Sequence, residues 1–306
     1  LYGISWVYGV TGTLQFDEIA AAISVDPSLN NLPLWFGLTF LIVGIAFKFG
    51  AVPFHMWLPD VYEGARSPMT LNLATAPKLA ALALTIRILV DGLGGLHDTW
   101  ASMIMVVAVL SLLVGNLVAI AQTNIKRMLG YSTIGHVGFI LLAIFCGTPE
   151  GNAAALFYTL TYVVAAAGAF GIIIIMSRRG YEAELLTDFN GLNARSPWFA
   201  LMMMFLMFSM AGVPPFVGFF AKLNVISAAL GSGYPGLAIL MVLASVVGAF
   251  YYLKVIWYMY FEPAEDQAIL QASTDTRLLL SLNSLAVLVL GIAPGWLLAL
   301  CIQVLG

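Results

Sequence analysis

The chain has 306 residues, of which 61% are hydrophobic and only 9% are charged. Soluble domains carry about 25% charged residues, so this composition excludes an ordinary soluble domain and predicts a membrane protein. The formal net charge of −3 offers no basic footprint for nucleic acid. The two cysteines and three histidines show no metal-ligand or haem spacing. We therefore expect no metal, cofactor or redox centre in this chain.

The apolar residues fall into long runs separated by short polar loops. Such runs predict an all-α membrane protein, a polytopic helical bundle, and not a β-barrel. We expect a single transmembrane domain over 1–306 with about nine helices, because the chain contains about nine such runs. They cover approximately 1–14, 33–62, 68–90, 101–121, 127–146, 153–177, 197–230, 235–260 and 278–304. Leu1 already lies inside an apolar run, and we expect further sequence upstream of it.

Two of these runs are interrupted by proline. AVPFHMWLPD breaks the run 33–62, and AGVPPFVGF breaks the run 197–230. Proline removes a helix hydrogen bond and clashes with the preceding turn, so two discontinuous helices are expected. Because they run in opposite directions, they indicate inverted-topology repeats.

The charges of the loops predict how the helices are oriented in the membrane. One set of loops is basic and contains Arg66, Lys126, Arg127, Arg178, Arg179, Arg195 and Arg277. The opposite set is acidic and contains Asp17, Glu18, Asp26, Asp98 and Glu150. Basic loops stay on the cytoplasmic side of a membrane. The basic set is therefore expected to face the cytoplasm or the equivalent compartment of an organelle.

Three lysines lie inside the apolar runs, namely Lys48, Lys78 and Lys222. A lysine near the bilayer centre costs roughly 2.5–3.5 kcal/mol even on a lenient insertion scale. Snorkelling from a helix end is the alternative for Lys48 and Lys222, whereas Lys78 lies far from both ends of its run. A row of such lysines could bind and release protons in turn. We therefore predict a role in proton transfer for all three.

Further polar residues within the runs are weaker candidates. His136 suits a proton relay because histidine titrates near neutral pH, although a single intramembrane histidine can simply be a packing residue. His55, in the first break, could relay protons or cap freed carbonyls, and Lys254 could release protons or snorkel. Core packing is expected to outweigh water-wire roles for Ser132, Thr133, Tyr158 and Tyr162. No Asp or Glu lies in the middle of a run, so a carboxylate partner for the lysines is expected upstream.

Three segments of the chain match a known family. AFKFGAVPFHMWLPDVYEGARSPMT, followed by APK at Lys78, resembles subunit N of proton-pumping NADH:quinone oxidoreductase, respiratory complex I. NLVAIAQTNIKRMLGYSTIGHVGFILL and MAGVPPFVGFFAKL are similar to the next signatures of that family. PDVYEGA together with QTNIKR and GYS favours subunit N over the sister subunits L and M. The resemblance covers essentially the whole chain.

The resemblance implies the C-terminal part of a fourteen-helix subunit with two inverted five-helix repeats. The chain would then hold a first-repeat remnant over about 1–92, a second repeat over about 101–260 and a final helix over about 278–304. By motif match, Lys48 is the first-repeat pump lysine, Lys78 the connecting lysine, His136 the next member, and Lys222 the terminal lysine. A glutamate that the family carries on its fifth helix has no counterpart in this chain.

The resemblance also implies the function. Protons would pass along the lysine and histidine chain, driven by redox chemistry in other subunits. NADH, flavin, iron–sulfur clusters and quinone would be bound by those membrane and peripheral subunits of complex I. The chain would be integral to a bacterial inner membrane or an organellar inner membrane, in contact with lipid and not with nucleic acid.

Two alternatives stay open. An Mrp-type cation/proton antiporter subunit belongs to the same superfamily, but a sodium site favours intramembrane carboxylates, which are absent here. A non-pumping structural scaffold would tolerate neutralisation of Lys78 without loss of pumping.

Overall fold

The computed structural model describes residues 1–306 except 178–180, 265–268 and 306, and it leaves out the side chain of Pro27. The regular secondary structure of the described residues is helical, apart from an isolated bridge between Asn124 and Leu185. The elements in chain order are α1 Tyr2–Thr11, α2 Phe16–Val25, η1 Pro27–Leu29, α3 Leu32–Phe49, α4 Trp57–Gly64, α5 Ser67–Ala74, α6 Ala76–Thr85, η2 Ile86–Gly92, η3 Gly94–Leu96, α7 His97–Ile120, α8 Ile125–Phe145, α9 Pro149–Met176, η4 Leu186–Phe189, α10 Leu192–Arg195, α11 Pro197–Ala211, α12 Val217–Gly231, α13 Pro235–Tyr260, α14 Thr274–Ile292 and α15 Gly295–Leu305.

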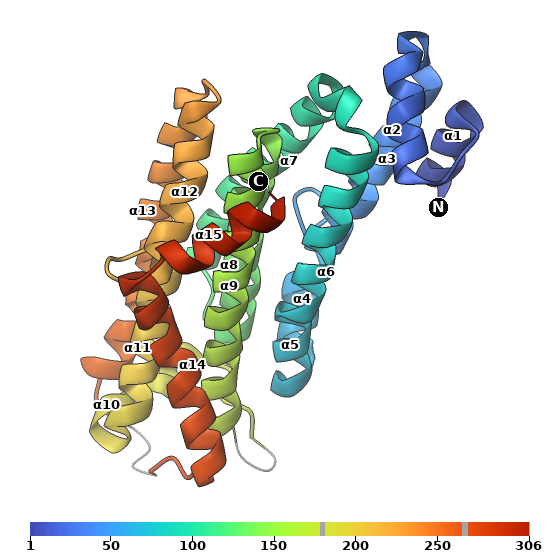
Figure 1. The fold of residues 1–306 in the computed structure, drawn as a ribbon. Coiled ribbons are helices and arrows are strands. Elements are labelled where there is room, and N and C mark those ends of the chain that lie inside the picture. Colours follow the sequence, from blue (N-terminus) through green and yellow to red (C-terminus); the bar gives the residue numbers. More distant parts are fainter. Residues whose placement is uncertain (178–180, 265–268, 306) are drawn as a thin grey trace.

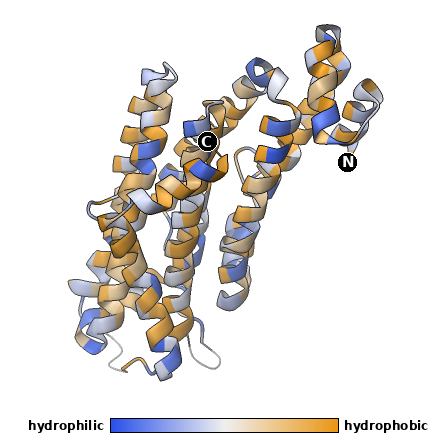
Figure 2. Cartoon of the chain, in the orientation of Figure 1, coloured by the Kyte–Doolittle hydropathy of each residue, from blue (hydrophilic) through white to orange (hydrophobic). Residues whose placement is uncertain are grey.

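Seven helical stretches among the described residues are long and apolar enough to cross a membrane. They are Leu32–Phe49, Ser67–Gly92, Gly94–Ile120, Ile125–Phe145, Pro149–Met176, Pro235–Tyr260 and Thr274–Ile292. Hydrophobic residues predominate along the helices, whereas hydrophilic residues concentrate toward their ends and in the loops (Figure 2). The prediction of an all-α, polytopic membrane protein is confirmed.

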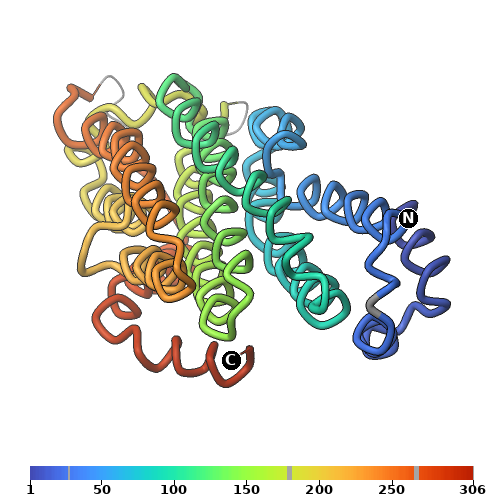
Figure 3. Tube along the Cα trace, turned by 90° about the horizontal axis from the view of Figure 1, so that it is seen from above, coloured from blue at the N-terminus to red at the C-terminus, as the bar shows by residue number. Residues whose placement is uncertain are grey.

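The centre of the bundle is α8. Every residue of this helix is buried except Arg127. Seen from above, α8 and α9 separate the N-terminal helices, drawn in blue and cyan, from the C-terminal helices, drawn in orange and red (Figure 3). A membrane helix shielded from lipid on all sides can carry polar residues at little cost, because other helices supply their hydrogen-bond partners. This position suits the many small and polar residues of its sequence.

Both predicted helix breaks are present. The first lies between Phe49, the last residue of α3, and Trp57, the first residue of α4. The second lies between Ala211 in α11 and Val217 in α12. Each first half ends in a left-handed glycine, Gly50 with φ 73° and Gly212 with φ 88°, a conformation that only glycine adopts without strain. The prediction of two discontinuous helices is confirmed.

The structure differs from the sequence prediction at three segments. An additional short helix, α2, follows α1, where no separate helix was expected. The run 68–90 divides at Thr75, because Pro77 in the first turn of α6 cannot continue α5. The expected single final helix over 278–304 is two helices, α14 and α15, because Pro294 lies at the junction and lacks the N–H that a continuous helix requires. Helix α15 packs obliquely across α9 (Figure 1).

The basic loops gather at one end of the bundle. The start of α5, helix α10 and the start of α14 lie together at the lower end of Figure 1, and Arg66, Arg195 and Arg277 belong to these segments. Arg178 and Arg179 lie outside the described residues, as does Gly306. That this end faces the cytoplasm stays a prediction from the positive-inside rule.

Candidate functional site

Lys78 occupies a buried position against the first helix break. Its side chain extends from α6, and its Nζ donates a hydrogen bond to the carbonyl oxygen of Phe49 at 2.7 Å. Phe49 is the last residue of α3, so its carbonyl lies at the negative end of that helix dipole, which favours a cation. The ring of Trp57 lies 6.0 Å from the same Nζ. The residue is 2% exposed, which excludes snorkelling.

Lys222 makes the same arrangement at the second break. Its Nζ donates to the carbonyl oxygen of Ala211 at 2.7 Å, and Ala211 is the last residue of α11. The ring of Phe139 lies 5.6 Å away. A Cβ at Gly212 would come within 2.9 Å of the Lys222 side chain. The glycine therefore both turns the backbone and leaves space for the lysine.

Lys48 does not share this position. Its side chain leaves the last turn of α3 and is exposed on the surface of the chain, and no hydrogen-bond partner of its ammonium is found among the described residues. It still lies close enough to Lys78 for the two charges to repel each other. Lys78, and not Lys48, is thus the structural counterpart of Lys222, although Lys48 and Lys222 lie on the two broken helices.

His136 lies on α8 between two tyrosine hydroxyls. Its Nδ1 is 2.8 Å from Tyr158 Oη, and its Nε2 is 2.8 Å from Tyr252 Oη. In a neutral imidazole one nitrogen donates and the other accepts, so His136 connects a tyrosine of α9 to a tyrosine of α13. Tyr252 in turn bonds to the hydroxyl of Ser132.

The other hydroxyls on α8 continue this network. Thr133 Oγ1 and Tyr162 Oη are 2.8 Å apart, and the Tyr162 ring lies 5.0 Å from the imidazole of His136, centroid to centroid. From the sequence, core packing was expected to outweigh water-wire roles for Ser132, Thr133, Tyr158 and Tyr162. The structure shows that they pack in the core and are also hydrogen-bonded there.

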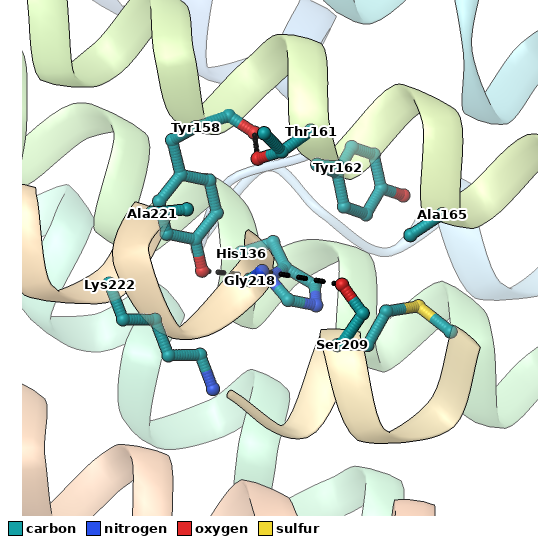
Figure 4. A pocket seen from close by; sticks show the side chains of 10 residues that line it. His136, Tyr158, Thr161, Tyr162, Ala165, Ser209, Gly218, Ala221 and Lys222 are labelled. Carbon is teal, nitrogen blue, oxygen red and sulfur yellow. Dashed lines mark hydrogen bonds between the residues drawn. The ribbon is translucent and has the colours of Figure 1, made fainter. Parts of the chain in front are cut away.

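A small cavity joins the histidine to the terminal lysine. It is lined by His136, Tyr158, Thr161, Tyr162, Ala165, Ser209, Met210, Gly218, Ala221 and Lys222 (Figure 4). Its volume of about 10 Å³ corresponds to roughly one water molecule. Its polar lining consists of hydroxyls, the imidazole and the lysine, with no carboxylate. The charge of Lys222 also acts electrostatically on His136.

The two weaker candidates lie apart from this cavity. His55 is buried in the first break, and its Nδ1 has no hydrogen-bond partner among the described residues. It therefore does not cap a freed carbonyl through that nitrogen. Lys254 lies in the second half of α13, where its Nζ contacts the carbonyl oxygen of Gln122 at 3.5 Å.

A buried charge cluster that the sequence did not reveal lies at the basic end of the bundle. Lys126, expected in a loop, lies in the first turn of α8 and is completely buried. Its Nζ lies 2.6 Å from Glu184 and 3.0 Å from Glu182, and it donates to the carbonyl oxygen of Ala65 at 2.9 Å. Burial raises the pKa of Glu182. The hydrogen bond and the positive charge of Lys126 lower this pKa by more, so the net pKa lies below the usual value. This cluster ties α8 to the segment after α9 and to the end of α4.

A second ion-pair group lies beside it. Arg127 Nη1 is 2.6 Å from Asp60 and 2.7 Å from Glu63. Glu63 thus pairs with Arg127 across the bundle and not with its neighbour in sequence, Arg66. We refer to Asp60, Glu63 and Arg127 as the charged mouth. The sequence places these residues near one end, but only helix packing brings α4 and α8 together.

Among the residues that the structure describes, no group of three or more His, Cys, Asp and Glu side chains could hold a metal ion. The cavity is instead lined by a lysine, hydroxyls and an imidazole. Together with the two discontinuous helices, they define an antiporter-like integral membrane protein. Residues 1–248 match the profile of the family described as NADH:quinone oxidoreductase/Mrp antiporter, TM, and the chain belongs to that family.

Individual relatives agree with this assignment. The chain is 59% identical over 300 residues to NADH-quinone oxidoreductase subunit N of Thioalkalivibrio sulfidiphilus, covering 98% of this chain and 62% of the relative. In respiratory complex I from Thermus thermophilus, one chain is 31% identical with a TM-score of 0.82, over 97% of this chain and 64% of that one. A chain of the membrane-bound sulfane sulfur reductase, an archaeal respiratory membrane complex, is 30% identical with a TM-score of 0.87, over 99% and 61%. The chain therefore spans a little under two thirds of the length of its relatives.

Proposed function

We propose that this chain forms part of subunit N of a proton-translocating NADH:quinone oxidoreductase, and that it moves protons through Lys78, His136 and Lys222. One observation carries the proposal: His136 and Lys222 line the same water-sized cavity between helices (Figure 4). A proton on Lys222 is held by the carbonyl at the end of α11. When it leaves, the neutral amine can accept another proton through the cavity.

The first half of the route uses charge repulsion. Lys48 and Lys78 lie close enough that their positive charges repel each other. Loading Lys48 therefore favours transfer of the Lys78 proton onward to the His136 network. His136 passes a proton by accepting at one nitrogen and donating from the other. Each transfer forms one bond to hydrogen and breaks another, with no oxidation of the chain.

The driving reaction belongs to other subunits in this proposal. NADH, flavin, iron–sulfur clusters and quinone are bound by the membrane and peripheral partners of complex I, and this chain holds none of them. The surrounding solvent is lipid, with no nucleic-acid partner. Because the relatives are bacterial proteins, the proposed location is a bacterial inner membrane. His55, at the first break, and Lys254, near the basic end, have secondary roles in proton transfer in this proposal.

A cation/proton antiporter of the Mrp type is the second candidate, since the matching family includes such proteins by its description. The lining of the cavity argues against it, because hard cations prefer oxygen ligands such as carboxylates and the cavity has none. A non-pumping scaffold is a third candidate. Burying two lysines at helix breaks costs free energy, and a purely structural role gives no reason for that cost.

The test is Lys222→Arg in the complete subunit, assembled in its complex and reconstituted into liposomes. Arginine keeps the charge but does not release its proton, because its pKa stays above about 12. Proton translocation driven by NADH is expected to fall at least about tenfold. Co-purification of the partner subunits, and NADH oxidation by a soluble electron acceptor, control for assembly.

Wild-type pumping by an assembled Lys222→Arg complex would show that the charge of this lysine matters and its titration does not. Pumping that requires sodium, measured in the same liposomes, would favour the antiporter.

A further inference from the structure

Tyr62 is a buried tyrosine whose hydroxyl is unused in the route described above. It lies on α4, is 0% exposed, and its Oη has no hydrogen-bond partner among the described residues. Buried tyrosine hydroxyls usually find a partner. A buried hydroxyl without a partner is therefore available to bond to a water molecule or to pass on a proton.

The packing of α4 turns this hydroxyl toward the centre of the bundle. Helix α4 approaches α8 closely at Gly130, where an added Cβ would lie 3.2 Å from the Cα of Pro59 and 3.5 Å from the ring of Tyr62. The Tyr62 ring also meets Phe170 of α9 edge-on, with centroids 5.8 Å apart. Thr133 is its hydrogen-bonding neighbour, although the two hydroxyls do not meet hydrogen-bond geometry, and Tyr162 acts on it electrostatically. Tyr62 thus faces the His136 network and not lipid.

The direction of hydrogen bonding leaves an open acceptor at this point. Thr133 has a single hydroxyl proton, which it donates to the carbonyl oxygen of Leu129 at 2.7 Å. Tyr162 must therefore donate its proton to Thr133 at 2.8 Å, and the Tyr162 oxygen keeps its lone pairs free. A proton arriving from Tyr62 has an acceptor there. Tyr162 also lines the cavity shared by His136 and Lys222.

The opposite side of Tyr62 leads to the surface. Asp60 and Glu63, its near neighbours on α4, belong to the charged mouth, and their side chains are 64% and 39% exposed. Carboxylates at a surface collect protons from bulk water. Helix α4 leads toward the end of the bundle that carries the basic loops (Figure 1), which is the predicted cytoplasmic side.

We propose that Tyr62 is a proton-relaying residue through which protons from the charged mouth reach the cavity of His136 and Lys222. The inference rests on the proposed function, because it supplies an uptake route to the same cavity. A proton binds to the oxygen of Tyr62 from a water on the mouth side. At the same time the existing O–H bond breaks and its proton passes, directly or through one water, to the oxygen of Tyr162, whose own O–H turns away from Thr133 and releases its proton into the cavity. One proton enters and one leaves, and rotation of the hydroxyl restores the starting state.

The experiment is Tyr62→Phe in the complete subunit within its assembled complex in liposomes, with Tyr131→Phe as the matched control. Tyr131 is a buried tyrosine of α8 whose ring contacts Arg127, and phenylalanine keeps that ring. Proton translocation is expected to fall about tenfold in Tyr62→Phe and to stay at the wild-type rate in Tyr131→Phe. The thermal midpoint should not fall in Tyr62→Phe, because removing an unpaired buried hydroxyl leaves no new unsatisfied group.

The solvent isotope effect supplies a readout that packing alone would not change. The wild-type translocation rate should slow in D₂O, and in Tyr62→Phe the isotope effect should change together with the rate. Wild-type translocation and an unchanged isotope effect in Tyr62→Phe would overturn the proposal. So would a loss of translocation explained by a matching loss of thermal stability. If Lys222→Arg, tested in parallel, also pumps normally, the proposed function itself fails, whereas a defect in Lys222→Arg alone rejects only the role of Tyr62.

Discussion

At the scale of single residues, the site depends on a hydrogen bond from a buried lysine to the carbonyl oxygen at the end of a helix. Both Lys78 and Lys222 donate to the last carbonyl of a half-helix, at 2.7 Å in each case. That carbonyl is unsatisfied by its own helix and carries the negative end of the dipole. A protonated lysine is therefore stabilised there without a carboxylate, which accounts for a membrane interior that contains buried lysines but no acidic residue in the cavity.

Gly212→Ala tests this contact. Alanine at φ 88° costs of order 1–3 kcal/mol, and its Cβ would lie 2.9 Å from Lys222 Cδ and 3.2 Å from Nζ. We expect both a lower thermal midpoint and a loss of proton translocation, measured on the reconstituted complex. Gly233→Ala is the control, because Gly233 has φ 84° but open space around its Cα. It should lose stability to a similar extent and still pump; equal pumping by both variants would contradict the role of Gly212.

At the scale of elements, ion pairs at the basic end hold helices that are distant in the sequence. Lys126 is fully buried and lies between Glu182 and Glu184. It also donates to the carbonyl oxygen of Ala65, directly after α4. A buried charge is tolerated only when it is paired. The cluster thus fixes the segment after α9 against α8, close to the charged mouth through which we propose that protons enter.

The pH dependence of stability tests this cluster. The pKa of Glu182 lies below its usual value of 4.5 in the folded protein. Its stabilisation is therefore fully present above the unfolded pKa and is lost as pH falls through the folded pKa. The thermal midpoint of wild type should drop on acidification below about pH 4.5, and Glu182→Gln should show a shallower drop over that interval. Glu150→Gln, at an exposed position, should follow wild type, and a Glu182→Gln curve parallel to wild type would remove Glu182 from this role.

At the scale of the whole molecule, orientation in the membrane decides the direction of transport. Three crossings separate Glu150 from Arg277, namely α9, the pair α11 and α12, and α13. An odd number of crossings places the two positions on opposite sides of a membrane. The positive-inside rule predicts that the basic end faces the cytoplasm, and in the proposed function protons then move from the charged mouth toward the other side.

Cysteine labelling tests this orientation. Cysteine is introduced at position 150 or 277 in a variant lacking Cys146 and Cys301, both of which are buried. An impermeant maleimide added to intact cells should label position 150, and position 277 should be labelled only after the membrane is opened. Labelling of both positions from the same side would contradict the crossing count.

Much of this protein follows from local sequence. Membrane helices were predictable because a bilayer requires long apolar runs with internally satisfied backbones. The two breaks were predictable because proline removes a backbone donor, and Lys78, His136 and Lys222 stood out because polar groups are rare and costly at such positions. The motifs also pointed to the family that the comparison identified.

Tertiary structure decided which of these residues meet. Lys48, Lys78 and Lys222 all stood out in the sequence, yet only Lys78 and Lys222 contact the end of a half-helix, and Lys48 lies on the surface. The burial of Lys126, the bonds of His136 to tyrosines of two other helices, and the unpaired hydroxyl of Tyr62 were not visible in the sequence either. The physical reason is that hydropathy and helix breaking act over a few neighbouring residues. A hydrogen bond or ion pair between helices depends on the rotation and spacing that packing around α8 imposes.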